Sequence, residues 1–264
     1  MIDMHSHILP SIDDGATSVD EAFKLIEEAK SVGFEGIVLT THYIEGYYDA
    51  DISRREALAK SIEDNLENRH LDVDLFLGNE IYISENIVNL LKEGKASTIN
   101  NTSYVLFELP FNQEPMFLYN IIYEMMQNKL VPILAHPERY EFAQRHPEFI
   151  YDLIQRGVLM QANYGSFIGE YGEKAQILAK KLIQNNMIHF LGSDVHRQNT
   201  IYTKIPKILS ELNKLISDDK IEELTSLNPK RVLQNKRIDI DEPHELRFSF
   251  KEKLIMKLWK RDRV

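Results

Sequence analysis

Residues 1–42, MIDMHSHILPSIDDGATSVDEAFKLIEEAKSVGFEGIVLTTH, contain a complete strand–helix–strand unit, and the rest of the chain repeats its pattern. Apolar, β-rich runs predict a first strand at about residues 2–5 and a second at 36–42. Between them, Ser18 and Glu21 form a capping box ahead of apolar residues at helical spacing, and a glycine ends the helix. Two strands joined by such a crossover helix lie parallel in one sheet.

The alternation continues to about residue 235. Five more strands are expected at about residues 73–80, 104–108, 131–136, 158–163 and 188–194. Helices are expected near residues 114–128, 147–157, 173–186, 202–216 and 218–234. Seven parallel strands with crossover helices, in a chain of 264 residues, predict an α/β protein with one barrel domain.

Composition excludes several classes of function. The net charge of −10 argues against a general nucleic-acid binder, because neutralising phosphates needs clustered Lys and Arg. Without any cysteine there is no disulfide, no thiolate zinc site and no cysteine nucleophile, so a bound metal must be held by His, Asp and Glu. The chain shows no secretory signal and no apolar run of about 20 residues, which predicts a cytoplasmic location.

The pattern changes after about residue 236, so the chain is divided into a barrel at 1–235 and an extension at 236–264. Residues 251–264 hold six Lys or Arg against two acids, with Leu254, Ile255, Leu258 and Trp259 at helical spacing. A terminal helix packed on the barrel, or a partly disordered tail, is the simpler interpretation. The alternative is a basic amphipathic helix that contacts an anionic membrane surface or a partner protein, which would place the protein at the inner face of the membrane.

Residues that bind metals cluster at the ends of the predicted strands. In a parallel barrel all carboxyl ends of the strands open onto one face, where such barrels hold their active sites. His70, His146, His189 and His244 lie elsewhere and receive no role. The residues at or just beyond strand ends are His5, His7, His42, Glu80, Glu108, His136, Asp194 and His196.

Spacing supports the same site. Residues i and i+2 of a strand point to one face, so His5 and His7 present two imidazoles to one ion, and Asp194 and His196 repeat the geometry.

A ninth candidate lies in the turn SIDDGA, where Gly15 permits tight backbone geometry beside an ion. Asp14 is the expected ligand there, although a solvated turn or a helix cap would also explain it. Asp13 is the alternative ligand, and Asp3 is expected to be structural or to lie behind the ligands.

Nine nitrogen and oxygen ligands without sulfur suit Mn, Fe or Zn, and Mg less well. They are too many for one ion. We therefore expect two or three divalent ions that share bridging carboxylates and a bridging hydroxide, with Glu80 as a bridge.

Five motifs, MHSH, TTH, GNE, AHPER and SDVH, resemble the PHP (polymerase and histidinol phosphatase) family. HSHILPSIDDGA, LFELPF and ILAHPERY are similar to its bacterial capsule and exopolysaccharide tyrosine-protein phosphatases, of the CpsB/YwqE type, over residues 1 to about 235. The resemblance implies a distorted seven-stranded (β/α)7 TIM-like barrel with its metal site at the C-terminal ends of the strands. It also implies one ion on His5, His7, Glu80 and Asp194, a second on Glu80, Glu108 and His136, and a third on Asp14, His42 and His196.

A phosphate monoester needs a nucleophile and neutralisation of its phosphoryl oxygens. A hydroxide bridging two ions, with manganese the expected metal, would attack phosphorus. Arg139, three residues after His136, would bind the phosphoryl oxygens; the alternative is a surface arginine paired with Glu138 or Glu141. The related phosphatases tend to have a second arginine where this chain has Ile201, and Arg197 is the candidate replacement.

The resemblance implies a protein-tyrosine phosphatase that acts on the tyrosine-rich tail of a cognate capsule-type tyrosine kinase and so regulates polysaccharide synthesis. A phenol leaves more readily than an alcohol, which agrees with that substrate. The alternatives are a small-molecule phosphatase of the histidinol-phosphate type, a nuclease of the same barrel type, and a non-catalytic regulator.

Overall fold

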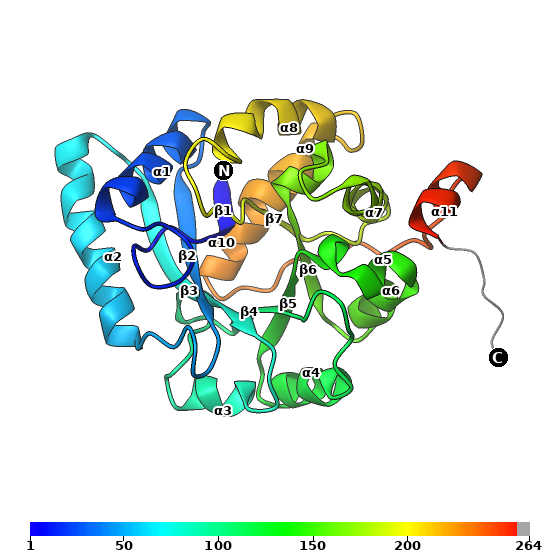
Figure 1. Cartoon of the computed structure of the whole chain (residues 1–264), viewed down its shortest axis with the longest axis horizontal. Coiled ribbons are helices and arrows are strands. Elements are labelled where there is room, and N and C mark those ends of the chain that lie inside the picture. Colours follow the sequence, from blue (N-terminus) through cyan, green and yellow to red (C-terminus); the bar gives the residue numbers. More distant parts are fainter. Residues whose placement is uncertain (258–264) are drawn as a thin grey trace.

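The computed structural model describes residues 1–257 of the chain. Its seven strands form one parallel sheet in the order of the sequence, with helices between them, and the prediction of seven strands is confirmed (Figure 1). The strands are β1 (Ile2–Ser6), β2 (Gly36–Tyr43), β3 (Asp74–Tyr82), β4 (Tyr104–Glu108), β5 (Val131–Ala135), β6 (Leu159–Asn163) and β7 (Phe190–Gly192).

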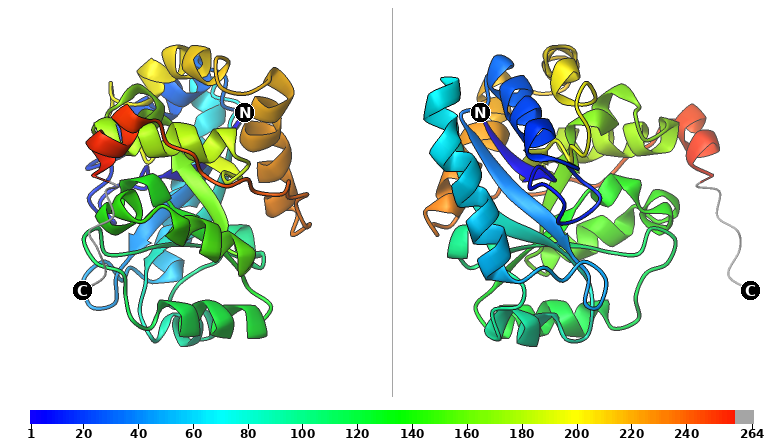
Figure 2. Two further views of the ribbon diagram at one scale, coloured as in Figure 1. Left: turned by 90° about the vertical axis from the view of Figure 1, so that its right-hand side faces the viewer. Right: turned by 60° about the vertical axis from the view of Figure 1, so that its left-hand side comes forward.

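The helices lie on the outer side of the sheet, as two further views show (Figure 2). Helices α2 and α3 are not predicted by the sequence pattern. The described helices are α1 (Val19–Ser31), α2 (Ile52–Leu66), α3 (Ile87–Lys92), α4 (Leu118–Gln127), α5 (Glu141–Arg145), α6 (Glu148–Gln155), α7 (Glu173–Gln184), α8 (Ile205–Leu212), α9 (Asp218–Glu222), α10 (Asn228–Leu233) and α11 (Phe250–Met256).

The prediction of a single helix at 218–234 is wrong in one respect. A π-helical turn, Glu223–Leu227, separates α9 from α10. Pro229 stands in the first turn of α10 and has no N–H to donate to the preceding turn, which explains why the regular hydrogen-bond pattern breaks there.

A buried carboxylate joins the first and last strands of the barrel. Between β1 and β7 the backbone makes an isolated bridge from Ser6 to Val195, so the barrel is nearly closed. Asp3 on β1 accepts hydrogen bonds from the Ser193 amide at 2.8 Å and from the Tyr202 hydroxyl at 2.7 Å. This agrees with the structural role expected for Asp3, and it ties the segment after β7 to the strand that carries His5.

Two apolar layers lie on either side of the sheet. The inner layer fills the barrel with side chains such as Met4, Val38, Leu106 and Phe190, and a larger outer layer packs the sheet against the helices. Ile238 belongs to the inner layer, so the C-terminal segment contributes to the barrel core. The core therefore supports the strands from both faces while their carboxyl ends carry polar side chains.

The segment after α10 runs across the molecule to α11, which lies beside α7 (Figure 2). The Tyr104 hydroxyl donates to the Lys236 carbonyl, the His244 amide donates to the Asn185 carbonyl, and Lys181 pairs with Glu252 at 3.2 Å. Leu258 and Trp259 of the expected amphipathic helix lie outside the described residues. Among the residues that the structure describes, no helix is long and apolar enough to cross a membrane.

Candidate metal centre

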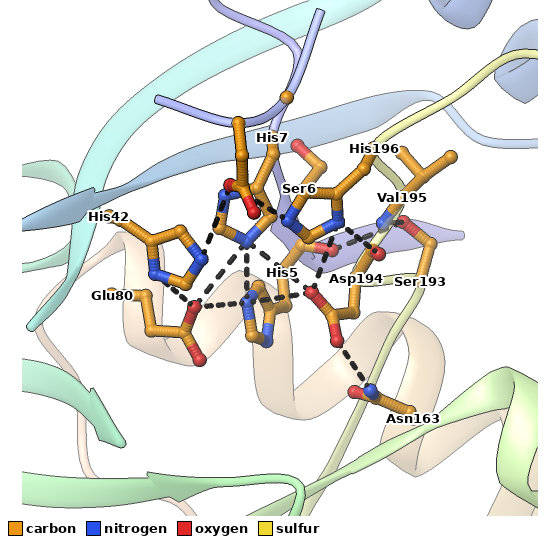
Figure 3. A network of polar contacts seen from close by, with 12 residues as sticks. His5, Ser6, His7, His42, Glu80, Asn163, Ser193, Asp194, Val195 and His196 are labelled. Carbon is orange, nitrogen blue, oxygen red and sulfur yellow. Dashed lines mark hydrogen bonds and ion pairs between the residues drawn. The ribbon is translucent and has the colours of Figure 1, made fainter. Parts of the chain in front are cut away.

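The nine predicted ligands lie together at the carboxyl ends of the strands, and every strand except β6 contributes. Figure 3 shows the part of this cluster formed by His5, His7, His42, Glu80, Asp194 and His196. His5 is the penultimate residue of β1 and His7 follows the strand, while Asp14 lies in the loop before α1. His42, Glu80 and Glu108 lie at the ends of β2, β3 and β4. His136 follows β5, and Asp194 and His196 follow β7.

Four buried side chains form the first ligand group: His5, His7, Glu80 and Asp194, whose ligand atoms lie within 4.8 Å of one another. Glu80 Oε2 lies 3.2 Å from His5 Nε2 and 3.4 Å from His7 Nε2. Asp194 Oδ1 lies 3.5 Å and 3.4 Å from the same two nitrogens. Two imidazole nitrogens and two carboxylate oxygens thus face a common point.

The hydrogen bonds behind the two histidines test whether a cation fits this group. His5 Nδ1 lies 2.7 Å from the amide oxygen of Gln161, and His7 Nδ1 lies 2.8 Å from a carboxylate oxygen of Asp13. Both partners accept, so both Nδ1 atoms carry the proton and both Nε2 atoms of the neutral rings present lone pairs. Those lone pairs face each other at 3.1 Å, an arrangement that a cation between them stabilises.

The second group is formed by His42, Glu80 and Glu108. His42 Nδ1 lies 3.0 Å from Glu80 Oε2 and 3.2 Å from Glu108 Oε1. His42 Nδ1 and Glu80 Oε2 are nevertheless buried without a hydrogen bond of acceptable geometry, which fits two ligands aimed at an ion rather than at each other. His136 contacts the other oxygen of Glu80 at 2.9 Å. Glu80 therefore faces both groups, as a bridging ligand would.

The third group surrounds Asp14 and is the most open to solvent. Asp14 Oδ1 lies 3.3 Å from His196 Nε2 and 3.6 Å from His42 Nε2, and His7 completes the group.

Asp13 lies behind these ligands: its carboxylate accepts from His7 Nδ1 and from the amides of Gly15 and His42. Gly15 is required here, because a Cβ at this position would lie 2.1 Å from the His7 carbonyl oxygen.

Two of the ligand residues have left-handed backbone conformations, which are unfavourable for residues other than glycine. His136 has φ 35° and ψ 56°, and Asp194 has φ 52°. Each such conformation destabilises the fold by about 1–3 kcal/mol, and such conformations occur mainly at functional sites. The His136 amide is held by the Gln161 carbonyl at 2.7 Å and the Asp194 amide by the His5 carbonyl at 2.8 Å.

Opposite charges determine the protonation of the cluster. Burial alone would raise the pKa of Glu80 and Asp194, but His5 and the other nearby cations hold the pKa of both carboxyls well below the usual range. Burial opposes the charged form of His42, yet the Glu80 and Glu108 carboxylates raise its pKa to about 10. His42 is therefore protonated in the metal-free protein, and a divalent cation would displace that proton.

Arg139 reaches into the same mouth. Its Nη1 donates to Asp194 Oδ2 at 2.6 Å, and its guanidinium lies over the rings of Phe111 and Tyr171, at 4.9 Å and 4.2 Å from their centroids. Its partner is thus Asp194, not the neighbouring Glu138 or Glu141.

Arg197 lies at the rim of the site. Its Nη1 donates to the backbone carbonyls of Asp14 at 2.8 Å and His196 at 2.7 Å, and also to that of Gly15. Ile201 is buried. The Arg197 guanidinium therefore holds the loop that carries Asp14.

Sequence reasoning missed two polar side chains behind the ligands, Gln161 and Asn163. Both are fully buried on β6, the strand that supplies no predicted ligand. A signal was present, since two amides alternate along an otherwise apolar strand and therefore point to one face.

Fold and site together define a class of metal-binding (β/α) barrel proteins whose ligands converge from separate strand ends. Within that class the chain belongs to the family "Capsular polysaccharide synthesis, CpsB/CapC", whose model matches residues 1–234.

Known proteins of similar sequence carry phosphatase names. The chain is 34% identical over 244 residues to the putative tyrosine-protein phosphatase CapC of Staphylococcus aureus, covering 90% of this chain and 93% of that protein. It is 29% identical over 238 residues to the tyrosine-protein phosphatase YwqE of Bacillus subtilis, with the same two coverages of 90% and 93%.

The fold also matches a solved relative. A crystal structure from work on YwqE of Bacillus subtilis and CpsB of Streptococcus pneumoniae, "unique metal-dependent tyrosine phosphatases", superposes with a TM-score of 0.87 at 28% identity. The match covers 94% of this chain and 100% of the solved chain, so the similarity includes the whole barrel.

Proposed function

We propose that this protein is a metal-dependent tyrosine-protein phosphatase, a hydrolase that cleaves the phosphate ester of phosphotyrosine. The observation that carries the proposal is the pair of Nε2 atoms of His5 and His7, which lie 3.1 Å apart and are flanked by Glu80 and Asp194. Such a site attracts a cation. The sequence relatives of this chain are named as tyrosine-protein phosphatases, one of them putative, and the solved structure is described as coming from work on metal-dependent tyrosine phosphatases. The chain has no cysteine, so a cysteine nucleophile plays no part.

The residues divide the chemical work. Bound divalent ions would supply Lewis-acid charge neutralisation and acidify water near neutral pH. The nine ligands would hold them: His5, His7, Asp14, His42, Glu80, Glu108, His136, Asp194 and His196.

Arg139 would bind the phosphoryl oxygens through its planar guanidinium, which Asp194, Phe111 and Tyr171 hold in place. Burial opposes the charged guanidinium, but the Asp194 carboxylate raises the pKa of Arg139, so the side chain stays charged at the pH of the assay. Arg197 is proposed to act at the rim, where it fixes the Asp14 loop and lies close to the exposed ligands.

We expect two or three ions, because the ligands form three groups. Neighbouring groups have one residue in common, which is Glu80, His42 or His7, so the ions would lie close together. Manganese is the proposed metal, with iron, zinc and magnesium as alternatives, since imidazole and carboxylate together suit the first three.

The proposed substrate is a phosphotyrosine protein, specifically the tyrosine-rich tail of a cognate capsule-type tyrosine kinase, so that the reaction would regulate polysaccharide synthesis. Support comes from the capsule-synthesis family to which the chain belongs. The basic C-terminal segment is proposed to contact a partner or the inner face of the membrane, since its residues 251–264 carry six basic side chains against two acids.

The test compares substrates on one preparation purified without chelator. Turnover of a phosphotyrosyl peptide is expected to exceed that of histidinol phosphate and of single-stranded DNA, to stop after chelation and to return with Mn²⁺. Faster turnover of histidinol phosphate or DNA would contradict the substrate class. Absence of bound metal, together with no turnover after Mn²⁺ is added, would contradict the enzyme and favour a regulator.

A further inference from the structure

Strand β6 contributes two buried amides that connect two of the ligands. Asn163 Nδ2 donates to Asp194 Oδ2 at 2.7 Å. A dashed line marks this contact in Figure 3. Gln161 Nε2 lies 3.0 Å from Asn163 Oδ1, and Gln161 Oε1 lies 2.7 Å from His5 Nδ1. Gln161 and Asn163 thus form a continuous chain of hydrogen bonds from Asp194 to His5, two members of the first ligand group.

The chemistry of its ends fixes the direction of this chain. Asp194 Oδ2 accepts from both Asn163 and Arg139, so Asn163 turns its NH₂ toward the carboxylate. The oxygen of Asn163 then faces Gln161, which must donate. The oxygen of Gln161 is left to face His5, so the proton of the neutral ring stays on Nδ1 and the Nε2 lone pair points at the ion site.

The same chain sets which oxygen of Asp194 is available. Asn163 Nδ2 and Arg139 Nη1 both donate to Oδ2, at 2.7 Å and 2.6 Å. Oδ1 remains for the metal side, where it faces the Nε2 atoms of His5 and His7. One pair of amides therefore orients a nitrogen ligand and an oxygen ligand of the same ion.

From this geometry we infer that Gln161 and Asn163 are positioning residues that act as one unit, fixing the His5 tautomer and the Asp194 rotamer for metal binding. The inference rests on the proposed metal site and is independent of the proposed substrate. Side chains that orient metal ligands typically change metal affinity about 10–100-fold when they are removed.

Neutral amides suit this position better than a carboxylate. His7 is oriented by Asp13, whose carboxylate also accepts from the amides of Gly15 and His42. Gln161 lies inside the barrel and is completely buried, beside a site that already holds several carboxylates. An amide orients His5 without adding another buried negative charge.

The experiment measures metal rather than turnover. Mn²⁺ affinity is determined by competition with a chelator for the wild type, Gln161→Met and Asn163→Leu, which remove the hydrogen bonds with little change in size. Each variant should bind one of its ions about 10–100-fold more weakly, and the double variant should lose no more than either single one. Gln176→Met is the control, because Gln176 donates to the Phe167 carbonyl without touching a ligand, and its Mn²⁺ affinity should be unchanged.

A second readout separates positioning from simple loss of packing. In the diamagnetic Zn²⁺-loaded protein, exchange of the His5 Nδ1 proton with solvent is followed by NMR. Asn163→Leu should speed this exchange although Asn163 does not bond His5, since Gln161 becomes free to rotate. Asn163→Asp still accepts from Gln161, so it should retain slow exchange while weakening metal binding through loss of the donor to Asp194.

Two results would overturn the inference. The first is wild-type Mn²⁺ affinity in both Gln161→Met and Asn163→Leu. The second is equally slow exchange of the His5 proton in Asn163→Leu, or in Gln161→Met should the leucine variant not fold. Neither result would bear on the phosphatase assay, which is measured separately with phosphotyrosyl peptide.

Discussion

Replacement of Gly192 by alanine is the most direct perturbation of the metal site that avoids every ligand. Gly192 ends β7 opposite Asn163 of β6. A Cβ at this position would lie 2.5 Å from His5 Cβ and 2.7 Å from Gln161 Nε2, whereas ordinary contacts begin near 3.4 Å. Strand β7 must therefore move away from β1 and β6 by about 1 Å, and the shift displaces His5 and Gln161 together.

The magnitude follows from that displacement. Overpacking in a filled interior costs about 1–3 kcal/mol, so Gly192→Ala should lower the free energy of unfolding by that amount. A misplacement of about 1 Å at a reacting site costs about 10²-fold in rate. We therefore expect a folded variant with weaker Mn²⁺ binding and a kcat about 10²-fold lower at saturating Mn²⁺.

Gly157→Ala provides the matched control. A Cβ there would lie 2.7 Å from Met126 Cε at a φ of +90°, so stability should also fall. Gly157 precedes β6 at the end of the barrel opposite the ligands, and its Mn²⁺ affinity and kcat should remain those of the wild type. If Gly192→Ala lowered stability but kept wild-type Mn²⁺ affinity and kcat, as the control is expected to do, the idea that the close approach at Gly192 positions His5 would be refuted.

Three further predictions test the site and the fold. Replacing His5 and His7 together with alanine should leave a folded protein with almost no turnover of p-nitrophenyl phosphate, and wild-type turnover would refute the metal assignment. Arg139→Met should lower kcat about 10²–10³-fold and Arg139→Lys somewhat less, because lysine keeps the charge but loses the planar fork; equal rates in wild type and Arg139→Met would exclude a phosphate contact. Burial, with a smaller contribution from Lys220, lowers the pKa of His189 from 6.5 to about 3. Between pH 6.5 and pH 3 the unfolded chain therefore binds a proton that the folded chain does not, so the free energy of unfolding decreases as the pH falls. His189→Asn keeps an acceptor for the Met160 amide. In urea unfolding, its loss of stability between pH 7 and pH 4.5 should be smaller than that of the wild type by about 2.5 kcal/mol, whereas an identical loss would refute a buried neutral His189.

The sequence predicts the strands well and places the candidate ligands near their carboxyl ends, because on every strand except β6 the apolar run stops where a charged or imidazole side chain begins. Helix α2 escapes prediction for a physical reason. Its buried face starts with Arg55, which is 1% exposed and donates to the Gly78 carbonyl and the Ser97 hydroxyl. A charged residue at a core position weakens the apolar period that reveals other helices.

The side chains behind the ligands depend on register, which sequence spacing does not give. Gln161 bonds His5 only because β6 lies beside β7, with Asn163 paired to Gly192. Asp13 and Asp14 are adjacent and chemically identical, yet the loop turns one behind His7 and the other toward His196. Backbone direction in a short loop decides between them, and it is set by contacts with distant strands.

His5 on β1 and His7 just after it are held by similar arrangements that differ in the chemistry of the acceptor. Each has an acceptor at Nδ1 and a glycine pressed against it: Asp13 and Gly15 at His7, Gln161 and Gly192 at His5.

The difference between the acceptors follows from the donors around them. Backbone amides of Gly15 and His42 stabilise the charge of Asp13, whereas Gln161 is bonded to a neutral amide inside the barrel. A carboxylate at 161 would still accept from His5 Nδ1, but its second oxygen would face the oxygen of Asn163, whose NH₂ is committed to Asp194, and would be buried without a donor. The orientation of His5 and His7 for metal binding thus depends on a neutral acceptor at His5, where no further donor is available, and on a charged acceptor at His7, where two backbone amides stabilise the charge.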